Sequence, residues 1–268
     1  MRFPILTIAL TLCSLTKGQG VDTQYGKCAP ADRQASVTFG IGRANQYDTY
    51  LSPLEYAGPQ ITIMNERIRP LQSSGGRVLF QSVLEVDANL SRTKAKTSRY
   101  ASADIHYDAG WYRAWRDVIF KNMTLRAGAQ VGATVGGLYC TRGGNNPAQA
   151  HAQVRLSLSA AAQYSFKIKR LPVTARYQAD APMLGAAFSP DYGQSYYELF
   201  IKSGYEHNIV FTHPANAPTI RQLTTLDLTL RHSTLRLGYL CTIRQGKLNH
   251  LRQHQWARSF MIGWCKTL

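Results

Sequence analysis

The longest regular alternation of polar and apolar residues begins at Gln153 and ends at Ile168. One parity carries apolar side chains from Val154 to Ile168, and the other carries small or polar side chains as far as Lys167. A period of two is that of a β-strand with one apolar and one polar face. Strands of soluble sandwiches usually have about 5–6 residues, so this length is typical of a wall between lipid and a wet lumen. The segment predicts a transmembrane β-barrel.

The same alternation recurs along the chain, at 78–90, 101–111, 123–135, 173–180 and 225–231. Bacterial barrels have an even number of antiparallel strands joined by short periplasmic turns and longer outer loops. We therefore predict an all-β, up-and-down antiparallel barrel of about twelve strands, with ten or fourteen as alternatives because 196–212 is either two short strands or one bent strand. The predicted strands are 35–43, 60–69, 77–90, 99–111, 121–137, 150–167, 171–181, 196–203, 205–212, 219–231, 234–244 and 255–267. The predicted tight turns are Lys169-Arg170 and His232-Ser233, and the predicted longer breaks are 44–59, 91–98, 138–149, 182–195, 213–218 and 245–254.

The first twenty residues have the organisation of a secretory signal peptide. A basic Arg2 precedes an apolar run that ends at Leu15, and two small residues, Gly18 and Gly20, follow. The run is too short for a membrane-spanning helix, which needs about 20 residues. The alternative of a lipoprotein acceptor at Cys13 is disfavoured because the preceding residue is a leucine. We expect a cleaved signal at 1–20, a periplasmic segment at 21–34, a barrel at 35–268, and a location in the outer membrane.

The chain is strongly basic, with 31 Lys and Arg against 15 Asp and Glu and a formal net charge of +16. A basic protein can bind nucleic acid, but an export signal leads away from the genome, so we expect no such partner. Outer-membrane lipid and the phosphates of lipopolysaccharide are the expected partners. The candidate contacts are Arg92, Lys94, Lys96, Arg142, Lys247 and Arg252. The alternative is that these residues only line solvated loops.

Many charged residues share the polar parity of the predicted strands. Because an unpaired buried charge costs several kcal/mol, these residues predict a lumen filled by a lattice of arginines and carboxylates. The alternative is a narrow pore in which an excess of arginine selects anions. The candidate lumen residues are Glu85, Asp87, Asp104, His106, Asp108, Arg126, Arg155, Arg176, Asp180, Arg221, Asp227, Arg231, Arg236 and Arg258.

Cysteine spacing indicates neither a metal site nor a disulfide between the last two strands. Cys241 shares the parity of outward leucines, whereas Cys265 has the opposite parity to Phe260 and Ile262. Cross-strand partners must point the same way, so we expect free thiols. No metal-ligand spacing is present, and we expect no cofactor.

Aromatic residues gather near the predicted periplasmic ends of several strands. They are Trp111, Tyr112, Trp115, Tyr164, Phe166 and Trp264. Aromatic belts mark the membrane interfaces of barrels. The grouping therefore predicts that these side chains form one such belt.

Four segments carry a resemblance to a known family: Y-D-T-Y-L-S-P-L-E-Y at 47–56, S-P-D-Y-G-Q-S-Y-Y-E-L-F at 189–200, and the stretches 207–218 and 221–240. The resemblance continues to the final strand and covers nearly the whole mature chain. The chain resembles a family of uncharacterised outer-membrane barrels from the Bacteroidales, known only as a domain of unknown function. The resemblance implies an outer-membrane location and no known reaction. Barrels of this kind commonly end on an aromatic residue, which the barrel-insertion machinery recognises, whereas this chain ends on Leu268.

We expect a monomeric, non-enzymatic barrel that is structural or a narrow conduit for small solutes. The alternative function is a lipid-modifying hydrolase, which needs a Ser–His pair on one outward rim. His232 and Ser233 are adjacent and would point to opposite faces of a strand, and His106 has no obvious serine partner. The segment 47–56 is predicted to fold over the mouth or to form a ligand-binding lid. A soluble sandwich is disfavoured by the length of the alternation.

Overall fold

In the computed structural model, the described residues are 33–144, 146–191, 193–196, 199, 207–230 and 233–267. They form eleven strands and one short 3-10 helix. The strands are β1 (Gln34–Asp48), β2 (Ser52–Pro70), β3 (Val78–Thr93), β4 (Arg99–Arg116), β5 (Met123–Cys140), β6 (Ala148–Ile168), β7 (Leu171–Phe188), β8 (Ile209–Thr212), β9 (Thr219–Thr229), β10 (Thr234–Leu248) and β11 (Leu251–Thr267), and the helix η2 is Gln72–Ser74. The predicted signal peptide and most of the predicted periplasmic segment lie outside the described residues.

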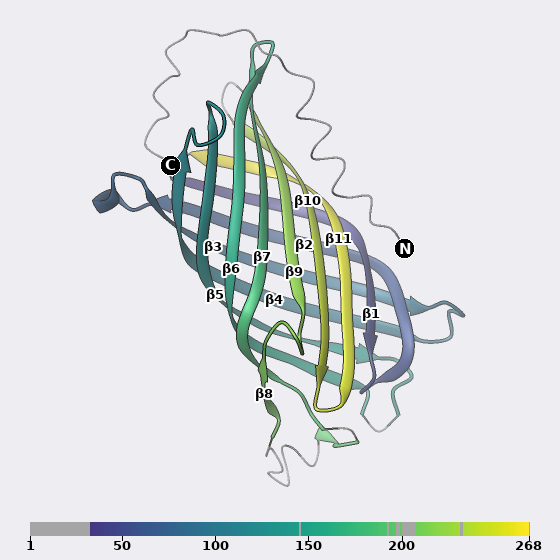
Figure 1. Cartoon of the computed structure of the whole chain (residues 1–268). Helices are drawn as coiled ribbons and strands as arrows, with labels where there is room; N and C mark the ends of the chain where they lie inside the picture. Colours follow the sequence, from purple (N-terminus) through teal and green to yellow (C-terminus); the bar gives the residue numbers. More distant parts are fainter. Residues whose placement is uncertain are drawn as a thin grey trace.

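Ten of these strands close into a barrel (Figure 1). From β1 to β7, each strand pairs antiparallel with the next strand in the chain, and β9 pairs with β7. The ring is closed by β11, which pairs with β1 from Gln34↔Thr267 to Asp48↔Gln253. β8 lies outside the ring and pairs only with the last residues of β7, from Gly185 to Phe188. The predicted antiparallel barrel is confirmed, with about ten strands in place of twelve.

The strands differ from the prediction in number at one place and in length at two others. The predicted strand 196–203 lies mostly outside the described residues, and 205–212 contributes only the four residues of β8. The breaks predicted at 44–59 and 245–254 are instead the tips of long hairpins, because β1 and β2 are separated only by 49–51, and β10 and β11 by Asn249 and His250. The segment 47–56 is therefore mostly paired strand and not a lid.

We call the end of the barrel where β1 begins and β11 ends the terminal end, and the opposite end the loop end. The loop end carries the hairpin tips at 49–51 and 249–250, and also β8 and the other described residues between β7 and β9. In Figure 1 the loop end is at the bottom, next to β8. Within the described part of the chain, no helix has the length and apolar character to cross a membrane.

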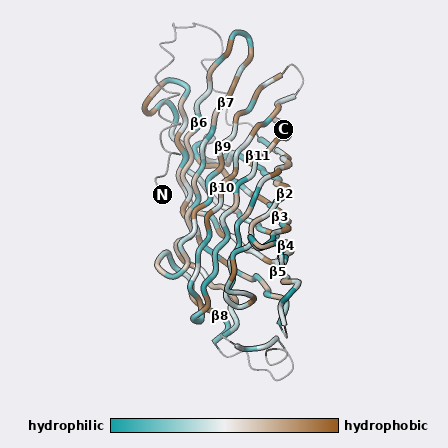
Figure 2. Tube along the Cα trace, turned by 90° about the vertical axis from the view of Figure 1, so that its right-hand side faces the viewer, coloured by the Kyte–Doolittle hydropathy of each residue, from teal (hydrophilic) through white to brown (hydrophobic). Residues whose placement is uncertain are grey.

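The two faces of the barrel wall differ in the way that the sequence alternation predicts. Hydrophilic and hydrophobic residues alternate along the strands (Figure 2). The outer wall exposes large apolar side chains, among them Ile41 and Phe260, each 74% exposed. The inner face is mostly polar and buried, and a small apolar cluster there consists of Met64, Val83, Leu223, Leu240 and Met261. A wet or ion-paired interior inside an apolar wall is the arrangement of membrane barrels.

The predicted aromatic belt is only partly on the outer wall. Trp111, Trp115 and Trp264 are exposed there towards the terminal end, and the rings of Tyr164 and Phe166 stack on each other. Tyr112 corrects the prediction, because it has the inward parity of β4 and is buried inside the barrel. Among the described cysteines, Cys140, Cys241 and Cys265 are free.

Candidate functional site: the charged lumen

The inner face of the barrel carries acidic and basic side chains in nearly equal numbers. The acids are Asp48, Glu66, Glu85, Asp87, Asp104, Asp108, Asp180 and Asp227, and the arginines are Arg126, Arg155, Arg176, Arg221, Arg236 and Arg244. Eight acids therefore face six arginines and the two histidines His106 and His151. Among the described residues the lumen has no excess of arginine, which removes the basis for the anion-selective alternative.

Glu66 on β2 is the centre of the first ion-pair group. Its two carboxylate oxygens lie 2.7 Å from Nη2 of Arg176 and 2.6 Å from Nη1 of Arg236. Arg236 also donates to both carboxylate oxygens of Asp227, at 2.6 and 2.7 Å. Glu66 and both arginines are almost completely buried, so each charge in this group depends on its partners for compensation.

Arg221 on β9 is the centre of the second group. Its guanidinium donates to Glu85 at 2.6 and 3.0 Å and to Asp180 at 3.1 Å. Asp180 also accepts a hydrogen bond from Gln178 at 2.9 Å. One arginine therefore joins carboxylates from β3 and β7, which lie on different sides of the barrel.

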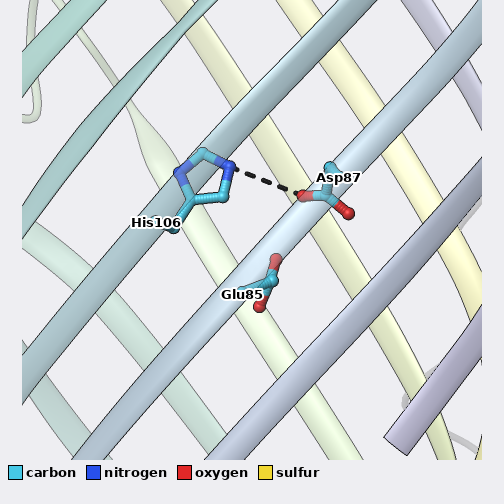
Figure 3. A group of neighbouring side chains, drawn as sticks. All are labelled: Glu85, Asp87 and His106. Carbon is cyan, nitrogen blue, oxygen red and sulfur yellow. Dashed lines mark ion pairs between the residues drawn. The ribbon is translucent and has the colours of Figure 1, made fainter.

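Glu85, Asp87 and His106 form a compact buried cluster, in which the two acids follow each other on one face of β3 and the histidine comes from β4 (Figure 3). One ligand atom from each lies within 4.8 Å of the others, a spacing that a metal ion could use. The donor atoms are already engaged, because Arg221 binds Glu85, and Gln60 and Thr62 donate to Asp87 at 2.9 and 2.5 Å.

His106 in this cluster also has partners on both ring nitrogens. Nδ1 lies 2.8 Å from the hydroxyl of Thr134, and Nε2 lies 3.2 Å from Nη2 of Arg244 and 3.4 Å from Asp87. An arginine can only donate, so Nε2 accepts and Nδ1 carries the proton. A cation placed here would adjoin two guanidinium groups, and we therefore assign the cluster to the ion-pair lattice.

Asp108 and Arg155 pair across β4 and β6, over a glycine in the strand between them. Nη2 of Arg155 lies 2.8 and 2.7 Å from the two carboxylate oxygens of Asp108. Gly132 of β5 lies between them, and a Cβ atom there would be only 1.9 Å from Oδ1 of Asp108. The absence of a side chain at Gly132 therefore makes room for this ion pair.

Replacement of Gly132 by Ala is expected to displace the Asp108 carboxylate and to destabilise the barrel by about 1–3 kcal/mol, the usual cost of overfilling a packed interior. The measurement is the urea midpoint for loss of the compact form in detergent micelles. Gly144→Ala is the control, because a Cβ atom added at Gly144 would have no neighbour within 4 Å. An unchanged midpoint for G132A would contradict this account of the glycine.

Three contacts cross the whole diameter of the lumen. In a ring of ten strands, opposite strands are five positions apart, and this relation holds for β2 with β7, β3 with β9, and β4 with β10. The corresponding contacts are Glu66–Arg176, Glu85–Arg221 and His106–Arg244. Side chains from opposite walls therefore meet at three places inside the barrel.

A small polar cavity lies on the loop-end side of these contacts. It has a volume of about 110 Å³ and is lined by Gln46, Gln149, His151, Arg244 and Gln253, among others. His151 Nδ1 lies 2.7 Å from Asp104, and Arg244 donates to Gln255 at 3.1 Å. A polar cavity of this size holds several waters or one small polar solute.

Most of the predicted lumen residues that the structure describes have their side chains on the inner face. Arg258 corrects the prediction, because it is exposed and shares the outward parity of Phe260 and Ile262. Arg231 and His232 lie outside the described residues. The prediction missed four residues, although each shares the inward parity of its strand with other polar residues: Asp48, Glu66, His151 and Arg244.

The predicted lipopolysaccharide contacts are all exposed and all lie near the loop end. Arg92, Lys94 and Lys96 surround the β3–β4 turn, Arg142 follows β5, and Lys247 and Arg252 flank the β10–β11 turn. Lipopolysaccharide binding by these residues stays a prediction, and their common location assigns it to the loop end of the barrel.

A family model described as "Protein of unknown function (DUF3316)" matches residues 5–268. The chain belongs to this family. The resemblance to a family of unknown function is thereby confirmed, whereas the Bacteroidales origin stays a prediction. No curated protein matches the sequence.

Solved outer-membrane barrels are similar to this DUF3316 protein at a low level. Neisserial surface protein A has a TM-score of 0.38 and 11% sequence identity, over 87% of this chain and 97% of that chain. The transport unit of the Escherichia coli autotransporter AIDA-I has a TM-score of 0.43 and 7% identity, over 97% of both chains. A FadL homologue from Pseudomonas aeruginosa has a TM-score of 0.34 and 9% identity, over 92% of this chain and 94% of that chain. Similarity at this level carries no information about function.

Proposed function

We propose that this protein is an outer-membrane barrel whose lumen is closed at rest, and that its role is structural and not that of an open pore. The observation that carries the proposal is the set of three contacts across the lumen, Glu66–Arg176, Glu85–Arg221 and His106–Arg244. Each contact joins opposite walls. A solute passing through would have to separate the buried ion pairs Glu66–Arg176 and Glu85–Arg221, which costs several kcal/mol for each pair, and to break the hydrogen bond between Arg244 and His106.

The outer-membrane location in this proposal rests on the barrel wall and on the expected export signal. A closed ring of strands leaves no unpaired edge, and an apolar outer wall suits lipid. Folding would require the barrel-insertion machinery, and the exposed basic residues of the loop end would contact lipopolysaccharide phosphates. Passage of a small solute would then require rearrangement of the lattice.

The described histidine of the outer wall, His254, has no geometry that supports the hydrolase alternative. His254 bonds to Oδ1 of Asn45 at 2.9 Å and stacks on the rings of Tyr47 and Trp256. The residues two positions away on its strand are Arg252 and Trp256, neither of which is a nucleophile.

Conductance in planar bilayers tests the closed lumen. The purified protein is expected to insert without a steady ionic current. The double variant Glu85→Ser with Arg221→Ser is expected to pass more current than the unmodified protein, because one of the three contacts across the lumen is removed while two remain. Heat-dependent mobility in SDS gels verifies that each variant is folded.

The matched control is Glu55→Ser with Arg67→Ser, which removes one acid and one arginine from the exposed outer wall of β2. It is expected to remain without current. A steady current through the unmodified protein, at the level of an open channel, would refute the closed lumen.

A further inference from the structure

The net positive charge of the described residues lies outside the lumen. The described part of the chain has 26 Lys and Arg residues and 11 Asp and Glu residues. Six of these arginines and eight of these acids lie in the lumen, which leaves 20 basic and three acidic residues elsewhere. On the outer wall of the described strands, Glu55 is the one acidic residue. The outer wall therefore presents many basic side chains with almost no acidic ones to pair with.

Two of these basic side chains lie directly opposite each other on neighbouring strands. Arg43 of β1 and Arg258 of β11 are register partners, and both are exposed on the outer wall. Neither guanidinium has a hydrogen bond or an ion pair with any residue in the described part of the chain. Like charges directly opposite each other in a sheet are destabilising, so this pair needs an external anion.

The surroundings of the pair match the boundary between lipid tails and headgroups. The next outward residues towards the terminal end are Ile41 and Phe260, the most exposed apolar residues of their strands. The next outward residue of β11 towards the loop end is Trp256, which is 45% exposed and stacks on His254. Apolar residues on one side and an aromatic interface residue on the other place the two guanidinium groups at headgroup depth.

We propose that Arg43 and Arg258 together bind a phosphate group of a membrane lipid on the outer wall of the barrel. Two planar guanidinium groups on register-partner residues can offer several N–H donors to one phosphate. The acyl chains of the same lipid would lie along Ile41 and Phe260. The site rests on the membrane location proposed above and is independent of whether the lumen is closed.

This site differs from the basic residues near the loop-end turns. Those residues surround hairpin tips and loops, whereas Arg43 and Arg258 lie within paired strands, four residues or more from the nearest hairpin turn. Their backbones are fixed by the β1–β11 pairing, so the two side chains start from neighbouring positions on the wall. Preorganised donors lose less entropy on binding than donors on separate loops.

Lipid retention tests the proposal. The protein is folded in detergent with lipid A carrying two phosphates, phosphatidylglycerol or phosphatidylcholine, and is washed by detergent exchange before native mass spectrometry. The unmodified protein is expected to retain one of the first two lipids at least tenfold better than the double variant R43Q/R258Q, because the variant loses the charge-assisted hydrogen bonds to the phosphate. A tenfold difference corresponds to about 1.4 kcal/mol.

The arms of the experiment identify the source of the phosphate and exclude a general charge effect. Preferential retention of lipid A or of phosphatidylglycerol identifies the lipid. Displacement of the retained lipid by inorganic phosphate alone at low millimolar concentration would overturn a lipid site. The control R67Q/R116Q removes the same charge from exposed positions near the terminal end and is expected to retain lipid. Equal retention by R43Q/R258Q and the unmodified protein would refute the proposal.

A second measurement covers the case in which R43Q/R258Q does not fold. A photo-crosslinking amino acid at Ile41, with both arginines intact, is expected to label a phosphorylated lipid more strongly than the same group at Ile105 on the wall of β4, which is also exposed. Equal labelling at the two positions would refute the site. If the protein instead stays soluble without detergent, the membrane location itself fails, and that result is separate from loss of lipid selectivity.

Discussion

Replacement of Glu66 by Ala is expected to lower the free energy of unfolding by about 3–5 kcal/mol, the cost of leaving buried charges without a partner. Glu66 compensates both Arg176 and Arg236, and all three side chains are almost completely buried. Arg236 keeps Asp227 as a second partner, whereas Arg176 has no other carboxylate among its described contacts. Arg176 therefore accounts for most of the expected loss.

The measurement for Glu66 is urea-induced unfolding in lipid vesicles, followed by tryptophan fluorescence and by gel mobility. Glu55→Ala is the matched control, since it changes the same residue type on the same strand at an exposed position. Exposed substitutions of this kind usually change stability by less than about 0.5 kcal/mol. Equal effects of the two substitutions would mean that the lumen is more hydrated than its burial indicates.

Replacement of Tyr100 by Ala is expected to cost about 3–5 kcal/mol, the range for truncation of a buried aromatic side chain. Tyr100 is fully buried on the inner face of β4, where its ring stacks on Tyr56 at a centroid distance of 3.4 Å. Leu138 and Cys140 complete this apolar cluster near the loop end. The alanine would leave a cavity that the rigid strands of a closed barrel cannot fill.

Tyr107→Ala is the control for Tyr100, because Tyr107 lies on the outer face of the same strand and is 49% exposed. We expect its unfolding midpoint to change much less than that of Tyr100→Ala, in the same vesicles and with the same fluorescence readout. If both variants lose the same stability, the stacked cluster is not a core of the barrel.

The sequence was sufficient to predict the barrel because each strand has an apolar face for the outer wall and a polar face for the lumen. β6 was predicted at 150–167 and extends over Ala148–Ile168, since a period of two with one apolar face specifies both strand and orientation. The ends of the strands were harder to predict. Beyond the apolar band both faces of a strand are polar, as at Gln253 and His254. Such residues resemble a loop in sequence, although in the structure they are paired.

The inward parity was sufficient to locate most lumen charges but not their partners. Glu85 and Arg221 are far apart in sequence and meet only because a ring of ten strands places β3 opposite β9. Which residues meet across a lumen depends on strand number and stagger, and neither is contained in local periodicity. The prediction of Arg258 as a lumen residue was wrong for a different reason. At the edge of an apolar wall, the long side chain of an arginine can extend its charged group to the membrane interface, so an outward position is tolerated.

The pairing of β1 with β11 has a consequence for the order in which this protein folds. The two strands come from opposite ends of the described chain, whereas every other pair in the ring except β7 and β9 is a sequence-adjacent hairpin. Contacts between residues distant in sequence form slowly, because the intervening chain must first be constrained. Hairpins would therefore form early, and the seam between the first and last strands would close late, so insertion intermediates should be curved, open sheets.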